Sequence, residues 1–217
     1  PTGSGKTTTL HSALSEINSV GRKIWTAEDP VEITQAGLRQ VQVSPRIGFD
    51  FAAAMRGFLR LDPDVIMIGE MRDLETSNIA IEAALTGHLV LSTLHTNSAP
   101  ETVTRLMDQG INLFSLADAF LGVLAQRLLR RLCRHCKVAR PATATELVTV
   151  RRTFGETGLL RRLGLKEDSE LQFWEAPGCS ECRNTGYRGR LAVHELLVVN
   201  EVPVSYTHLT LPTIREV

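Results

Sequence analysis

Short apolar runs alternate with segments of helical spacing over the first half of the chain. Four runs have the pattern of strands: 23–27, 39–43, 65–69 and 89–94. Segments of helical spacing lie around them at 7–20, 50–61, 75–85 and 100–109. Strands that alternate with helices form βαβ units, so the pattern predicts an α/β fold with a mostly parallel sheet.

The longest apolar stretch with helical spacing follows at 114–131. We expect it to form the last helix of this region. Asp118, Gln126 and Arg127 interrupt its apolar residues, so the stretch is too short and too polar to cross a bilayer.

The first seven residues, PTGSGKT, match all but the leading glycine of the phosphate-loop pattern G-x-x-x-x-G-K-[ST]. Gly3 and Gly5 would let the backbone turn tightly and aim N–H groups at phosphate oxygens. Lys6 would add positive charge, and Thr7 would supply a hydroxyl for Mg²⁺. The alternative is an ordinary Gly-Ser turn before a helix. The expected nucleotide-binding residues are Gly3, Ser4, Gly5, Lys6, Thr7 and Thr8.

Three candidate catalytic residues, Glu28, Glu70 and His95, each follow a predicted strand. The carboxyl edge of an open α/β sheet is where ligands bind, so we expect these side chains to meet there. The phosphate loop would follow a further strand upstream of this sequence. His88 begins its strand and lies farther from that edge, so a structural role is at least as well supported for it.

Four cysteines form two C-x-x-C pairs: Cys133, Cys136, Cys179 and Cys182. The 42 residues between the pairs exceed the spacing of a compact zinc ribbon, but two such pairs favour tetrahedral Zn²⁺ over a redox site. The alternative is four small buried thiols. His135 lies between two cysteines, which makes it a poor substitute ligand. Metal binding rather than disulfides would imply a reducing compartment.

Composition limits the number of domains and the classes of partner, but it does not indicate a function. The chain has 217 residues, is 43% hydrophobic, and carries 24 Lys and Arg against 24 Asp and Glu. This length suggests one domain or two unequal ones, and the balanced charge favours neither nucleic acid nor an acidic partner. A basic run begins in the predicted last helix and continues beyond it: Arg127, Arg130, Arg131, Arg134, Lys137 and Arg140. It is either a solvated helix face that offsets a zinc–thiolate charge or a surface for a subunit or an acidic membrane protein. No aromatic residue interleaves with it, so base stacking is not indicated.

Taken together, these segments resemble the C-terminal ATPase half of type II secretion and type IV pilus assembly ATPases. Beside the phosphate loop, the resemblance rests on 26–32, which is similar to the family's aspartate box, on 61–73, its Walker B region, and on 86–97, its histidine box. The paired C-x-x-C motifs resemble those of assembly and secretion members, whereas pilus-retraction ATPases lack them. The resemblance covers about residues 1–201.

The resemblance implies a RecA-like P-loop core that hydrolyses Mg²⁺-ATP as a homo-hexamer. It implies work on the cytoplasmic face of the inner membrane with platform proteins of a secretion or pilus machine, and no nucleic acid. Glu28 would orient and deprotonate the attacking water, and Glu70 would hold Mg²⁺ through water, although the two could exchange roles. His95 would sense the γ-phosphate. Arg56 and Arg60 are candidates to reach a neighbouring subunit's phosphates, although a surface salt bridge is the commoner role for an arginine.

Two other functions share parts of this pattern. A hexameric P-loop motor that moves nucleic acid would have the same phosphate-site residues, but the charge balance gives it no support. An inactive interaction module held together by zinc is the second alternative, and the presence of Lys6, Thr7, Glu28 and Glu70 speaks against it.

We expect three segments: a RecA-like ATPase core at 1–131 without its first strand and first phosphate-loop glycine, a zinc-bearing subdomain at 132–202, and a non-native tail at 203–217. The tail has Pro203 and Pro212 and no helical period, where the family continues into a helix. The family's N-terminal domains are absent from this sequence.

Overall fold

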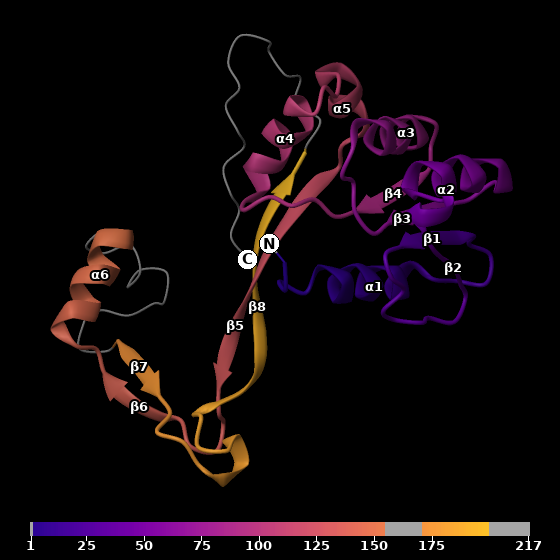
Figure 1. The fold of residues 1–217 in the computed structure, drawn as a ribbon. Coiled ribbons are helices and arrows are strands. Elements are labelled where there is room, and N and C mark those ends of the chain that lie inside the picture. Colours follow the sequence, from indigo (N-terminus) through magenta and orange to yellow (C-terminus); the bar gives the residue numbers. More distant parts are fainter. Residues whose placement is uncertain (1, 155–170, 200–217) are drawn as a thin grey trace. The chain divides into compact units, whose positions relative to one another are not determined.

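The computed structural model describes residues 2–154 and 171–199. The described chain divides into two compact units (Figure 1). Unit 1 comprises the residues up to Arg127 and those from Ala192 onward, and unit 2 comprises Leu128–Leu191. Unit 1 thus combines two separate stretches of the chain, and the division into a core at 1–131 and a zinc-bearing subdomain at 132–202 stays a prediction. The segment expected to be a tail, 203–217, lies outside the described residues.

Unit 1 is built on a four-stranded parallel sheet in the order β2-β1-β3-β4. The strands are β1 (Ile24–Glu28), β2 (Leu38–Gln42), β3 (Val65–Ile68) and β4 (Leu89–Ser92). In register, Ala27 lies beside Ile68, and Ile68 lies beside Ser92, so these strands end at the same edge. The expectation of an α/β fold with a parallel sheet is confirmed.

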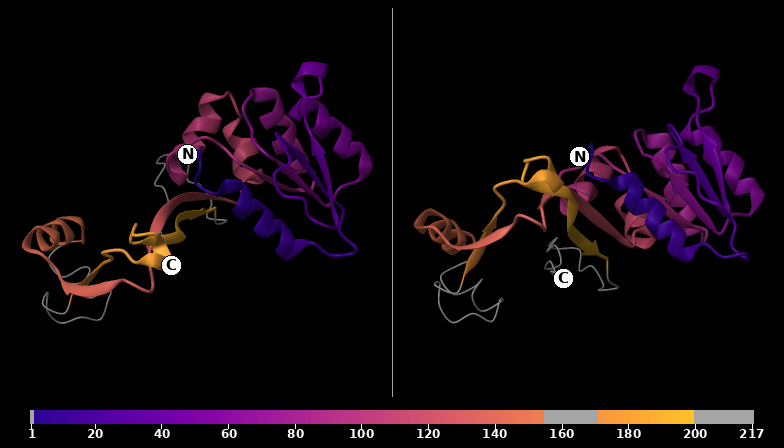
Figure 2. Two further views of the ribbon diagram at one scale, coloured as in Figure 1. Left: turned by 60° about the horizontal axis from the view of Figure 1, so that its bottom comes forward. Right: turned by 90° about the horizontal axis from the view of Figure 1, so that it is seen from below.

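Helices cover both faces of this sheet (Figure 2). The helices of unit 1 are α1 (Lys6–Ile17), α2 (Phe51–Phe58), α3 (Leu74–Leu85), α4 (Ala99–Asp108) and α5 (Leu113–Ala119), with a 3₁₀ turn, η2 (Leu59–Leu61), after α2; α5 packs beside α3. Successive residues of a strand point to opposite faces, and β3 shows this clearly. Ile66 and Ile68 pack in the cluster that contains α2 and α3, whereas Val65 and Met67 pack with Leu14 of α1.

The helix termini follow the expected capping chemistry. Asp50 accepts a hydrogen bond from Ala53 N at 2.8 Å and begins α2, as its position in the sequence predicts. Asp73 caps α3 in the same way through Thr76 N, and Ser98 caps α4.

The prediction of one helix over 114–131 is correct only as far as Ala119 and is wrong beyond it. The helix α5 ends at Ala119, and the chain then forms β5 (Gly122–Leu132), which pairs with β8 (Tyr187–Val198). The strands approach closely at Gly122, where a Cβ atom would lie 2.6 Å from the carbonyl oxygen of Leu197. A strand partner this far along the chain supplies backbone hydrogen bonds that local spacing cannot reveal, and it overrides helical propensity.

Unit 2 contains a second strand pair and a short helix. Strand β6 (Val138–Pro141) is antiparallel to β7 (Gln172–Glu175), and α6 (Ala144–Phe154) follows β6. A 3₁₀ turn, η4 (Ser180–Cys182), precedes β8. The basic run lies on and after β5, so the interpretation of it as a helix face is wrong.

None of the helices in the described ranges is long and apolar enough to pass through a membrane.

Candidate functional site

The phosphate-loop segment adopts the backbone that its glycines allow. Gly3 and Gly5 have φ angles of 73° and 84°, in the left-handed region that favours glycine. Helix α1 begins directly after, at Lys6, and its N-cap residue, Gly5, has no side chain to cap the first turn. The first N–H groups of a helix carry a partial positive charge, so this terminus suits an anion.

Ser4 gives a second indication of a ligand in this loop. Its side chain is 4% exposed, and its Oγ atom has no hydrogen-bond partner among the described residues. A buried hydroxyl normally has a partner, so an orphaned one beside a helix N-terminus fits a phosphate group that would provide that partner. Lys6 and Thr7 are half-buried on the first turn of α1, and Thr8 is exposed.

Glu28 ends β1 and is buried, with 3% of its surface exposed. Its Oε1 atom accepts hydrogen bonds from Thr26 Oγ1 at 2.6 Å and from Gln40 Nε2 at 3.0 Å. Its Oε2 atom lies 3.1 Å from Nε2 of His11, which comes from α1. Three neighbouring elements therefore hold this carboxylate in one orientation, and α1 lies against the carboxyl end of β1.

Glu70 and His95 meet at the same edge of the sheet. The segments after β3 and β4 stay joined beyond the strands, because Met71 N donates to Thr93 O at 3.1 Å and Thr93 Oγ1 donates to Gly69 O at 2.7 Å. This brings His95 Nε2 to 2.6 Å from Glu70 Oε1.

Arg72 binds the other oxygen of Glu70 through Nε at 2.6 Å. The hydrogen bond and the charge of Glu70 raise the pKa of Arg72. Asp29 also lies near this guanidinium, at 3.9 Å. The side chain of Glu70 is 15% exposed and opens into a pocket. The pocket is lined by Glu70, Met71, Arg72, Leu94, His95, Arg105 and Gln109.

The remaining candidates lie away from these contacts. His88 Nδ1 lies 2.9 Å from Ala83 O at the end of α3, which is a structural contact. Arg56 on α2 pairs with Glu75 on α3, and Arg60 is exposed on η2. A reach toward another subunit remains a prediction for both arginines.

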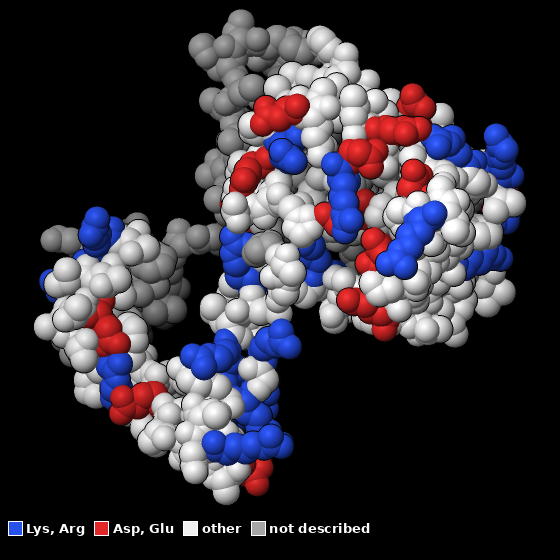
Figure 3. Space-filling view, in the orientation of Figure 1, with Lys and Arg blue, Asp and Glu red and all other residues white. Residues whose placement is uncertain are grey.

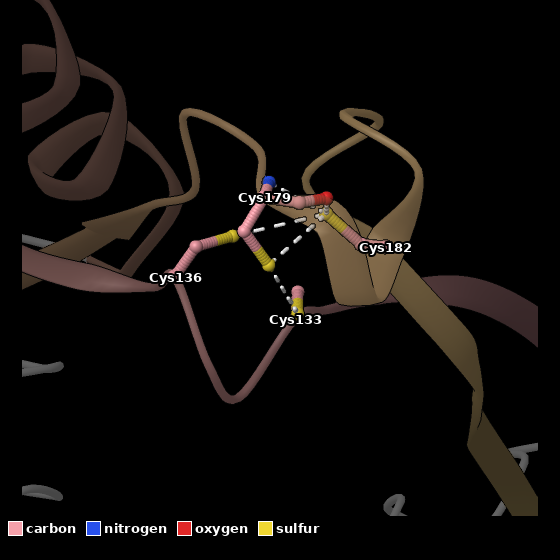
Figure 4. Close-up of side chains that lie close together, drawn as sticks. All are labelled: Cys133, Cys136, Cys179 and Cys182. Carbon is pink, nitrogen blue, oxygen red and sulfur yellow. Dashed lines mark hydrogen bonds between the residues drawn. The ribbon is translucent and has the colours of Figure 1, made fainter.

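The four cysteines come together in unit 2 (Figure 4), with all four sulfurs within 4.8 Å of one another. They are free thiols, and the Sγ atoms of Cys133 and Cys179, and of Cys136 and Cys182, are each 3.9 Å apart. Sulfurs bound at about 2.3 Å to a tetrahedral zinc lie about 3.8 Å from each other. The donor set and its spacing therefore fit Zn²⁺.

Two backbone N–H groups donate hydrogen bonds to one of these sulfurs and favour its thiolate form, which is the form that binds a metal. Cys179 N and Gly186 N donate to Cys182 Sγ at 3.2 and 3.3 Å. Burial opposes ionisation of this thiol, but the hydrogen bonds outweigh it and lower the pKa of Cys182 to about 6. Gly186 has a φ of 73°, and a Cβ atom there would lie 2.3 Å from Ala176 O, so this turn needs glycine.

Charge is distributed unevenly between the two units. Residues 128–191 contain 13 Lys and Arg against 7 Asp and Glu, so the neutral total hides a basic unit 2. Blue side chains gather over its β5 and β8 segments in Figure 3. Aromatic rings from other strands lie beneath several of these cations. Arg130 stacks on Tyr187 at 4.2 Å, and Lys137 stacks on Trp174 at 4.3 Å.

Comparison with known proteins assigns this chain to a family. The family model described as "Type II/IV secretion system protein" matches residues 1–211. The chain belongs to this family. The matched range continues beyond Pro203, into the segment whose composition suggests a non-native tail.

Relatives in the type II/IV secretion system family are similar over nearly the whole chain. The type II secretion system protein E of Aeromonas hydrophila is 49% identical over 201 residues, which are 93% of this chain and 38% of that protein. The type IV pilus assembly ATPase PilB of Thermus thermophilus is 50% identical over 205 residues, which are 93% of this chain and 21% of that protein. The chain thus spans less than two fifths of the length of these relatives.

Solved structures of the same family share the fold. The pilus retraction motor PilT with bound ADP has a TM-score of 0.56 and 36% identity, and the match covers 78% of this chain and 53% of that one. The ATPase DotB of Legionella pneumophila has a TM-score of 0.57 and 28% identity, covering 92% and 44%.

Sequence reasoning missed several residues that hold this site together. They are His11, Gln35 and Gln40 around Glu28, and Gln126, Arg127, His194 and Glu195 from β5 and β8. Each acts through a partner distant in sequence, so no local motif marks it.

Proposed function

We propose that this chain carries the ATP-hydrolysing site of a motor that powers type II secretion or type IV pilus assembly. The observation that carries the proposal is the glycine N-cap of α1 beside the orphaned Ser4 hydroxyl. This loop leads directly into α1, and His11 of the same helix contacts Glu28, a candidate catalytic residue. The names of two relatives as a type II secretion system ATPase and a type IV pilus assembly ATPase, and the bound ADP in the PilT structure, support it further.

The loop would bind the phosphates by position and charge. The N–H groups of Gly3, Ser4, Gly5 and the first turn would face the phosphate oxygens, and the Lys6 ammonium would neutralise the terminal phosphates. Thr7 would supply its hydroxyl to Mg²⁺, whose positive charge would help to neutralise the phosphates.

The two glutamates would divide the remaining work. Glu28 would orient the attacking water and accept its proton, since Thr26, Gln40 and His11 hold its carboxylate rigidly. Glu70 would hold Mg²⁺ through water. The reverse assignment has support of its own, because Glu70 is the less buried of the two and opens into the pocket.

His95 would report the state of the γ-phosphate. Its Nε2 atom is bound to Glu70, so a charge change at Glu70 or at the nucleotide would act directly on this imidazole. Hydrolysis would then change the interactions of the segment that connects His95 to α4.

In unit 2, Cys133, Cys136, Cys179 and Cys182 would bind one structural Zn²⁺. Four thiolates fill a tetrahedral site and leave no position for a reacting water, so the metal would be silent in catalysis. Its role would be to hold the two C-x-x-C turns together.

The resemblance to secretion and pilus ATPases supports a homo-hexamer on the cytoplasmic face of the inner membrane, with platform proteins of the machine as partners. Arg56 and Arg60, exposed on α2 and η2, would be the candidates to complete a neighbouring subunit's site.

The phosphate loop offers the direct test of this function. Lys6→Ala in the full-length protein should abolish ATP turnover while the thermal unfolding midpoint stays close to that of the unchanged protein. Arg22→Ala, on an exposed residue after α1, is a matched control that should hydrolyse ATP normally. Unchanged turnover in Lys6→Ala would refute the assignment.

A further inference from the structure

Gln126 on β5 is a buried polar residue that the catalytic scheme does not use. It is 8% exposed, and its side-chain amide makes three hydrogen bonds within unit 1. Nε2 lies 2.5 Å from Ser4 O, and Oε1 lies 2.7 Å from Thr9 Oγ1 and 2.9 Å from His194 Nε2. The amide thus joins the phosphate loop, the first turns of α1 and strand β8.

The chemistry of these partners fixes the orientation of the amide. A backbone carbonyl only accepts hydrogen bonds, so the NH₂ group of Gln126 must face Ser4. The amide oxygen then faces the hydroxyl of Thr9 and the ring of His194, and both of these must donate. His194 therefore carries its proton on Nε2, and the amide has no alternative flip.

We propose that Gln126 is a positioning residue that sets the phosphate loop for nucleotide binding; the proposal rests on the function proposed above. In a trans peptide the C=O and the following N–H point in opposite directions. Holding the carbonyl of Ser4 against Gln126 therefore aims the N–H of Gly5 at the opposite side of the loop, away from β5. The bond from Thr9 fixes the first turns of α1, whose N–H groups would bind the same phosphate.

Neighbouring side chains of β5 and β8 hold the other side of the site. Arg127 donates to Asn97 O at 2.8 Å, shortly after His95, and Glu195 accepts from Ala99 N at 2.9 Å. Gln126 and Arg127 are adjacent in the chain, so the phosphate loop and the segment after His95 are fastened to the same point of β5. Gln126 thereby acts on the site from outside, without touching the nucleotide.

Nucleotide affinity in the full-length protein is the decisive measurement. The dissociation constants of Mg-ADP and Mg-ATP would be determined by calorimetry for the unchanged protein, Gln126→Leu and Gln126→Glu. One buried hydrogen bond corresponds to a change of up to about tenfold, so we expect Gln126→Leu to bind about tenfold more weakly. Gln126→Glu keeps both acceptor contacts but places a carboxylate against Ser4 O, so it should bind more weakly still.

Two controls separate positioning from general stability. Gln42→Leu changes an exposed glutamine of β2 whose side chain accepts a hydrogen bond from Val31 N, and the nucleotide affinity of this variant should not change. Thr9→Val removes a single contact and should weaken binding about threefold, with less than additive loss when combined with Gln126→Leu. If Gln126→Leu does not fold, Thr9→Val and His194→Ala decide the question alone.

Lys6→Ala, measured in parallel, keeps the two proposals distinguishable. If Lys6→Ala hydrolyses ATP normally, the proposed function fails. If Lys6→Ala loses turnover while folded Gln126→Leu, Thr9→Val and His194→Ala all bind nucleotide as the unchanged protein does, the positioning role of Gln126 is overturned.

Discussion

The imidazole of His11 lies with Nε2 3.1 Å from Oε2 of Glu28, and both side chains are only 4% exposed. The other ring nitrogen lies 3.0 Å from Gln35 Oε1. A protonated imidazole would donate hydrogen bonds to both oxygens. A neutral ring would donate to Glu28 through Nε2 and accept at Nδ1 from the NH₂ group of Gln35, with the Gln35 amide turned over. In either state, a residue on the phosphate-loop helix holds the candidate catalytic carboxylate.

Glu28→Gln should bind ATP but turn it over about 10²–10⁴-fold more slowly, because the amide cannot accept the proton of the attacking water. The amide NH₂ would also face one of the three donors, so we expect a loss of about 1–3 kcal/mol in the free energy of unfolding. Steady-state ATPase assays and urea unfolding measure the two effects.

Glu70→Gln is the matched variant for this test, because it changes the second glutamate of the site in the same way. It should weaken the dependence of activity on Mg²⁺ concentration. Normal turnover in Glu28→Gln together with loss of turnover in Glu70→Gln would show that the two roles are exchanged.

The arginine pair can be tested by mixing subunits. If Arg56 or Arg60 acts on a neighbouring subunit, mixtures of Arg56→Ala or Arg60→Ala with Lys6→Ala should regain part of the ATPase activity, since each subunit supplies what the other lacks. Arg39→Ala, on an exposed residue of β2, is the control and should be active unmixed. Hexamers that form but show no rescue at any ratio would assign both arginines to structure, as the Arg56–Glu75 contact suggests.

Metal analysis and X-ray absorption should find one zinc per chain with four sulfur ligands. A structural zinc site supplies on the order of 10 kcal/mol to folding, so chelation should loosen residues 132–191 in hydrogen exchange. Nucleotide affinity should change by no more than a few fold, because the phosphate loop is held by residues of unit 1.

Two results would contradict the hypothesis that the four cysteines form a structural zinc site. The first is protein without zinc, and the second is zinc with nitrogen or water ligands. Cys133→Ser should remove one of the four sulfur ligands and reduce the zinc content, whereas His135→Ala should leave the zinc content unchanged.

Acid should disturb the start of α6 at an unusually low pH. Arg140 donates to both oxygens of Glu146, at 2.8 and 2.6 Å, and lowers the pKa of Glu146 to about 2, with help from the Thr143 N–H. Because the folded pKa is depressed, the stabilising contacts are complete above an unfolded value of about 4.3 and are lost as the pH falls through about 2. Carboxyl NMR should follow this titration. Arg140→Gln should move the midpoint toward about 4.3, and a midpoint there in the unchanged protein would refute the pairing.

The elements that could be predicted from sequence are those whose pattern is local. Val65–Ile68 is buried on both faces, so its continuous apolar run predicts a central parallel strand. Asp50 caps its own helix three residues later, and the C-x-x-C pairs place two thiols on each turn. The meeting of Glu70 with His95 also follows, because it depends only on two parallel strands ending at one edge.

The elements that could not be predicted depend on distant partners. Leu124 to Leu132 has helical spacing, and only pairing with β8 makes it a strand. From the sequence alone, Gln126 is only a polar interruption of the predicted helix, and its hydrogen bond to Ser4 O is visible only in the structure. Trp174 and Tyr187 lie far in sequence from the cations that they contact, so the basic run appears free of aromatic residues.

The cysteine cluster also bears on how β5 and β8 come to pair. These strands are separated by 54 residues, from Leu132 to Tyr187. Cys133 follows β5 directly and Cys182 lies shortly before β8, so a metal held between them would act as the turn of a hairpin. Loop-closure entropy grows with the logarithm of loop length, and this clip would reduce its cost by roughly 1–2 kcal/mol. The segment between the two C-x-x-C pairs could then lengthen or shorten without weakening the pairing that brings His194 to Gln126.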